Sequence, residues 1–120
     1  MARVPISGVN DEAITGVATD VREMISGLDI DGDARTFFLR WMMIANEHAS
    51  QIAVFEYYDS DEDTGPTAAL QRGVIHVPPG ETVLVEFEEP GQKFVTNLTC
   101  GVTNGTINTN GGVAAGGYLI

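Results

Sequence analysis

The chain has 120 residues and a strong excess of acidic side chains, with 17 Asp and Glu against 6 Lys and Arg and a net charge of −11. This length suffices for one domain with a core of its own. The acidity argues against binding to nucleic acid or to an anionic membrane surface, because both depend on basic residues that neutralise phosphates. It suits solubility, a salt-rich environment, or a surface complementary to a basic partner.

The single cysteine, Cys100, excludes an internal disulfide and CxxC metal sites. It shares its register with Phe94, Leu98 and Val102 in a predicted strand, so we expect a buried structural thiol. The N-terminus has no apolar run of the kind found in signal peptides, and no segment approaches transmembrane length. We therefore expect a soluble protein made in a cytoplasm.

The first third of the chain predicts an N-terminal arm followed by an element that is either a strand or a helix. Residues 1–11 read as an extended N-terminal arm, because Pro5 and Gly8 discourage regular structure. A single domain then covers residues 12–120. Over residues 14–25 the apolar spacing fits a helical stripe, whereas alternating β-branched residues favour a strand. We favour the strand, with the helix as the alternative.

A β-hairpin centred on His48 is predicted over residues 35–59, and it is apolar on both faces. A hairpin with one buried face should instead alternate apolar and polar residues. One face, which includes Trp41, is assigned to the core. The other face is predicted to be a subunit or partner interface formed by Phe38, Arg40, Met42, Ile44, Ile52, Val54, Glu56 and Tyr58. Arg40 and Glu56 would then oppose each other, and the alternative is that residues 1–28 cover this face.

The second half of the chain predicts further short strands separated by turns. They span residues 70–77, 81–88 and 94–102, followed by a Gly-rich closing strand within residues 105–120. In the second of them, Val83, Val85 and Phe87 are expected to face inward. Seven or eight strands with turns about every 8–12 residues are typical of an all-β protein. We predict an antiparallel β-sandwich, immunoglobulin-like or jelly-roll-like.

Motifs that could carry chemistry are weak. His48 and His76 belong to no nucleophile–base motif, so we predict no enzymatic activity. Two turns space carboxylates as calcium prefers, and their residues are Asp29, Asp31 and Asp33, and Asp59, Asp61 and Asp63. Neither turn has the glycine and the glutamate that complete an EF-hand loop. We therefore predict solvated acidic turns, with no metal and no cofactor.

Several segments resemble small β-sandwich structural proteins of tailed-phage virions. They are Phe37 to Asn46 (FFLRWMMIAN), Ile52 to Asp59, Val77 to Val83 (VPPGETV) with a strand ending in Phe87, Lys93-Phe94, and the Gly-rich final segment. Together they cover about residues 14–120. The VPPGETV turn followed by an alternating strand also occurs in cell-surface and carbohydrate-binding modules.

The resemblance implies a capsid decoration or cement protein, or a head–neck accessory protein, that is often a trimer. Its partner would be the major capsid protein or another virion protein, and its location the capsid surface after assembly in the host cytoplasm. Val4, Pro5 and Ile6 would form a capsid-docking arm. The competing function is a carbohydrate- or cell-surface-binding module, in which exposed aromatic rings stack on sugars and a calcium loop can assist binding.

Overall fold

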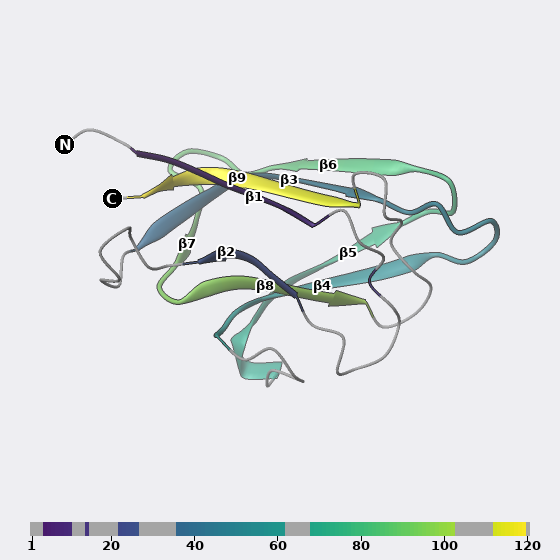
Figure 1. Ribbon diagram of the computed structural model, residues 1–120, viewed down its shortest axis with the longest axis horizontal. Coiled ribbons are helices and arrows are strands. Elements are labelled where there is room, and N and C mark those ends of the chain that lie inside the picture. Colours follow the sequence, from purple (N-terminus) through teal and green to yellow (C-terminus); the bar gives the residue numbers. More distant parts are fainter. Residues whose placement is uncertain are drawn as a thin grey trace.

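The computed structural model describes residues 4–10, 14, 22–26, 36–61, 68–102 and 112–119. In these residues the chain forms nine strands and one 3₁₀ turn, arranged as two layers (Figure 1). The elements are β1 (Val4–Asn10), β2 (Arg22–Ser26), β3 (Phe37–Ala45), β4 (Ala53–Asp59), η1 (Ala68–Leu70), β5 (Gln71–Val77), β6 (Thr82–Glu86), β7 (Gln92–Phe94), β8 (Asn97–Val102) and β9 (Val113–Leu119). The predicted antiparallel β-sandwich is confirmed, with nine strands in place of seven or eight.

The strand order gives the sandwich its topology. The first sheet has the order β1-β9-β3-β6, with β7 also paired to β3, and the second sheet has the order β2-β8-β4-β5. β6 and β7 pair with successive parts of β3, so they act as one interrupted strand. Counted in this way, eight strands form two four-stranded sheets in the order of a jelly roll. This order favours the jelly-roll form of the prediction over the immunoglobulin-like form.

The core fills the space between the two sheets. Its largest fully buried side chains include Phe37, Phe55, Phe94 and Leu98, and the rings of Phe37 and Phe94 stack at 5.1 Å. Cys100 is buried among them, as predicted. The predicted strand over residues 94–102 is wrong in one respect, because it is divided between β7 and β8, which lie in different sheets.

The predicted hairpin over residues 35–59 is wrong, because β3 and β4 lie in different sheets. The connection between them crosses from one layer to the other and has its own polar support. The buried amide of Asn46 donates to the backbone carbonyls of Gln51 (2.8 Å) and Val77 (2.9 Å). The Nδ1 atom of His48 accepts the N–H groups of Ser50 and Gln51. The histidine is thus an acceptor within the crossing rather than the tip of a tight turn.

A β-bulge at Arg40 explains why β3 is apolar on both sides. The pairing of β3 with β9 skips this residue, which reverses the alternation of side chains at that point. Before the bulge Phe37 and Leu39 enter the core, and after it Met42 and Ile44 do so. The sequence pattern that suggested two apolar faces is therefore, in large part, one buried face whose phase changes.

The N-terminal segment is an edge strand and not a separate arm, which corrects the predicted boundary at residue 11. β1 pairs with β9 along its whole length. Pro5 is compatible with this position, because an edge strand needs hydrogen bonds on only one side. Gly8 allows β1 to approach the second sheet, since a Cβ atom there would lie 1.7 Å from the carbonyl oxygen of Met24.

The ambiguous element over residues 14–25 is described only in part. Residues Arg22–Ser26 form β2, so the strand interpretation is confirmed for this portion, and Ile14 is buried in the core. Residues 15–21 lie outside the described residues. Within the described residues, no helix is long and apolar enough to cross a membrane.

Candidate functional site

The eight residues of the predicted interface do not form one surface. Phe38 and Arg40 lie on the first sheet, Met42 and Ile44 are fully buried, Ile52 is exposed in the β3–β4 connection, and Val54, Glu56 and Tyr58 lie on the second sheet. The prediction assumed a hairpin, and its members separate because that hairpin does not form. The expected pair of Arg40 with Glu56 is accordingly absent. Arg40 instead pairs with Glu89, with Nη1 3.2 Å from Oε2.

The outer surface of the first sheet, which we call the first-sheet face, carries an apolar row that crosses its full width. Directly opposed residues form three rows across the strands: Val9, Ala114, Met43 and Leu84; then Ser7, Gly116, Trp41 and Glu86; then Pro5, Tyr118, Phe38 and Lys93. In the first row the exposed fractions are 69% for Val9, 38% for Met43 and 55% for Leu84. Exposed apolar side chains in a contiguous row are a common feature of surfaces that bind other molecules.

Trp41 occupies the middle of the first-sheet face, which corrects its assignment to the core. It is half-buried, and its indole lies over Gly116 of the neighbouring strand β9. A Cβ atom at Gly116 would come within 2.4 Å of the indole Nε1, so glycine is required beneath the ring. On the other side of β3, Glu86 stands directly opposite Trp41. An open hollow is lined by Arg40, Trp41, Leu84 and Glu86.

The third row is fixed by a loop between β6 and β7. The rings of Phe38 and Tyr118 stack at 5.4 Å, and the Tyr118 hydroxyl donates to the carbonyl of Pro90 at 2.7 Å. The Phe87 N–H group donates to the carbonyl of Arg40, the bulged residue, at 2.9 Å. The bulge, the break between β6 and β7 and the Arg40–Glu89 pair therefore coincide beside the Trp41 hollow.

Residues Val4, Pro5 and Ile6, predicted as a docking arm, lie in β1. Pro5 belongs to the first-sheet face, whereas Ile6 packs against the core. A docking role for Pro5 thus stays a prediction, now as part of a sheet surface rather than of a separate arm.

The outer surface of the second sheet, which we call the second-sheet face, carries polar contacts of its own. The Tyr58 hydroxyl donates to the carboxylate of Glu56. Burial, together with this hydrogen bond and the negative charge of Glu56, raises the pKa of Tyr58 to about 12. The Asn97 amide donates to Glu23 at 2.7 Å, which joins β8 to β2.

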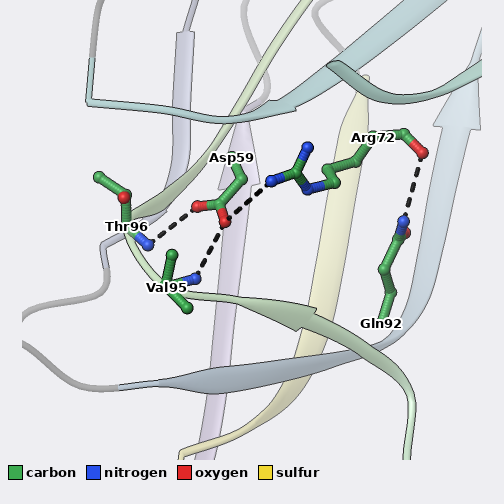
Figure 2. A network of polar contacts seen from close by, with 5 residues as sticks. All are labelled: Asp59, Arg72, Gln92, Val95 and Thr96. Atoms are coloured by element: carbon green, nitrogen blue, oxygen red, sulfur yellow. Dashed lines mark hydrogen bonds and ion pairs between the residues drawn. The ribbon is translucent and has the colours of Figure 1, made fainter. Parts of the chain in front are cut away.

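Asp59, a weak calcium candidate, is already occupied by protein groups (Figure 2). Its buried carboxylate accepts the N–H groups of Val95 (3.1 Å) and Thr96 (2.8 Å), and Arg72 lies 3.7 Å away. It therefore fastens the turn between β7 and β8 to the end of β4. Asp61 is exposed. Asp29, Asp31, Asp33 and Asp63 lie outside the described residues.

Gln92 links the two sheets close to the Asp59 contacts, which we call the Asp59 latch. Its side-chain amide donates to the Arg72 carbonyl at 3.2 Å, as Figure 2 shows, and its Oε1 accepts the Tyr57 hydroxyl at 3.1 Å. Burial raises the pKa of Tyr57, so this tyrosine stays a neutral donor. The contacts hold β7 of the first sheet against β4 and β5 of the second.

The remaining titratable groups are dispersed. His76 is exposed on β5 opposite Val54, whereas His48 lies in the connection between β3 and β4. Among the described residues, no group of three or more His, Cys, Asp or Glu side chains could hold a metal ion. No protein-family model, curated protein or solved structure matches this chain.

Proposed function

We propose that this protein is a non-enzymatic structural protein that joins protein subunits through the first-sheet face. The observation that carries the proposal is the apolar row of Val9, Ala114, Met43 and Leu84, which crosses four strands without a charged residue. Covering such a row with a partner removes apolar surface from water, at about 25 cal/mol per Å² before the costs of association. Repeated contacts in a lattice would add strength through multivalency.

The setting that we propose is a phage capsid, with the major capsid protein or another virion protein as partner and with self-association, as a trimer, on the capsid surface. The sequence resemblance supports this setting. The jelly-roll strand order adds an analogy, because that fold occurs in viral capsid domains and also in lectins. The analogy concerns the fold, and functions vary widely within one fold.

The charge of the first-sheet face is compatible with self-association. Its three rows contain one acidic residue, Glu86, and one basic residue, Lys93, in a chain whose net charge is −11. Two copies that meet through this face would bring few like charges into close contact. Association through the acidic remainder of the surface would be opposed by repulsion.

Light scattering coupled to size-exclusion chromatography tests the proposal on the full chain. We expect the wild type to form oligomers and Leu84→Lys to shift it towards the monomer, because the new charge lies in the apolar row. Val74→Lys is the matched control, since Val74 is similarly exposed (44%) on the second-sheet face. Oligomers that persist in Leu84→Lys and dissociate in Val74→Lys would contradict the assigned face. A monomeric wild type at millimolar concentration would contradict self-association.

The competing function, a carbohydrate- or cell-surface-binding module, is favoured by one observation. Trp41 borders an open hollow with polar groups at its rim, as a sugar platform requires. Thermal melts with neutral oligosaccharides, in calcium and in chelator, separate the two functions. Stabilisation by an oligosaccharide, with no oligomer formed, would favour the carbohydrate-binding module.

A further inference from the structure

The hollow beside Trp41 combines an aromatic wall, an apolar wall and a carboxylate. Trp41 leans over Gly116 on β9, away from β6, and leaves space on the β6 side of β3. Glu86 and Leu84 line that space from β6, both on the outer side of the strand. Directly opposed residues in a sheet have Cβ atoms about 5 Å apart, so the Glu86 side chain starts next to the indole.

Of the two charged side chains that line the hollow, one is paired and the other is not. Arg40 lies at its rim, but its guanidinium already pairs with Glu89. Glu86 is exposed and makes no ion pair or hydrogen bond with its side chain among the described residues. The hollow therefore presents one unmatched negative charge beside an aromatic ring. The surrounding chain, at −11, attracts cations at long range and repels anions.

We propose that this hollow receives an arginine side chain from the surface of a basic partner protein. The apolar stem of the arginine would lie on Leu84, its guanidinium plane would stack on Trp41, and its N–H groups would bind the carboxylate of Glu86. Arginine fits better than lysine, because the guanidinium is planar, stacks on aromatic faces and binds carboxylates with two parallel hydrogen bonds. This inference rests on the proposed protein-binding role of the first-sheet face and names the chemistry of its partner.

The chain contains one tryptophan, so the fluorescence of Trp41 reports directly on the hollow. The probes are two short peptides, glycyl-arginyl-glycine amide and the same peptide with citrulline, a neutral residue of nearly the same shape. We expect the arginine peptide to change the emission of Trp41 with saturation. The citrulline peptide should bind about tenfold more weakly, because it retains stacking and loses the charge-assisted bonds to Glu86.

Two variants locate the interaction. Glu86→Gln should weaken binding of the arginine peptide about tenfold, since it removes the charge and keeps the side-chain size. Glu81→Gln is the matched control, because Glu81 is exposed just before β6 and lies outside the hollow, and it should leave the affinity unchanged. Thermal melts of both variants verify that the fold is intact.

Three results would overturn the inference: equal affinity for the two peptides, equal effects of the two variants, or no response to either peptide. A saturable response to maltohexaose or xylohexaose without one to arginine would also overturn it and assign the hollow to carbohydrate. If the wild type forms oligomers that Leu84→Lys loses, but binds no arginine peptide, the inference fails while the proposed function stands. If the wild type is monomeric but binds the arginine peptide, self-association fails while the inference stands.

Discussion

The outer faces of the two sheets use their side chains in opposite ways. On the second-sheet face, Tyr58 bonds to Glu56 and Asn97 bonds to Glu23, so these polar groups find partners within the chain. On the first-sheet face, the row that ends in Leu84 offers apolar side chains that the described residues leave exposed. Both faces belong to one sandwich with one core. The paired polar groups of the second-sheet face stabilise the fold, whereas the exposed apolar groups of the first-sheet face remain available for a partner.

Because of this difference, we expect substitutions at the two places to affect different properties. Changes to the internal polar contacts near the second sheet should lower the free energy of unfolding. Changes on the first-sheet face should mainly alter association or binding, because exposed side chains contribute little to the stability of the isolated chain.

The largest effect is expected at Asp59. The substitution Asp59→Ala removes the charged acceptor of the partly buried hydrogen bonds from the Val95 and Thr96 N–H groups, and we expect a loss of about 3 kcal/mol in the free energy of unfolding. Asp61→Ala, at an exposed residue two positions along, should change it by less than about 0.5 kcal/mol. Urea unfolding followed by circular dichroism measures both. Equal losses in the two variants would contradict the role of Asp59 as a latch.

A smaller, pH-dependent effect is expected at Tyr58. Its pKa is about 12 in the folded chain and takes the ordinary value of 10.0 when unfolded, so the folded chain keeps a proton that the unfolded chain releases. Stability from this group is fully present below pH 10 and is lost as the pH rises from 10 to about 12, by about 1 kcal/mol once solvent screening of the partly buried hydroxyl is taken into account. Urea unfolding across this range measures the slope.

Tyr58→Phe provides the control for that slope, because phenylalanine cannot titrate. The variant should lose the part of the alkaline destabilisation that Tyr58 causes. It should keep the part that Tyr57 causes, because burial also raises the pKa of Tyr57. An unchanged slope in Tyr58→Phe would assign the alkaline transition to other groups.

The regular strands could be predicted from the sequence because their alternation is unbroken. In the segment around β6, Val83 and Val85 pair with the core residues Ile44 and Met42, which is the inward orientation that alternation predicted. The closing strand β9 was likewise predicted from its apolar end. Local pattern is enough in these cases, because each strand keeps one phase along its length.

The pairing of strands could not be predicted in the same way. The bulge at Arg40 moves the core positions of β3 from one parity to the other, and no local motif marks it. The Trp41–Glu86 pair also joins residues 45 positions apart in the sequence, so its existence depends on the β3–β6 register. One usable signal was present: Gly116 and Gly117 lie inside a predicted strand, and glycine there indicates close approach of another group.

The smallest of the predicted effects on stability concerns Gly116, the glycine beneath the indole of Trp41. In Gly116→Ala the new Cβ atom would lie 2.4 Å from the indole Nε1, so the ring must move. We expect a change of about 1 kcal/mol or less in the free energy of unfolding, since the ring sits on the outer face and its displacement opens no cavity in the core. Its fluorescence should shift to the red and become more sensitive to acrylamide quenching. Ser7→Ala alters the residue opposite Gly116 in the same row and should leave the emission unchanged. If Gly116→Ala emits like the wild type, the indole does not rest on this glycine, and the geometry assigned to the hollow on its other side loses its basis.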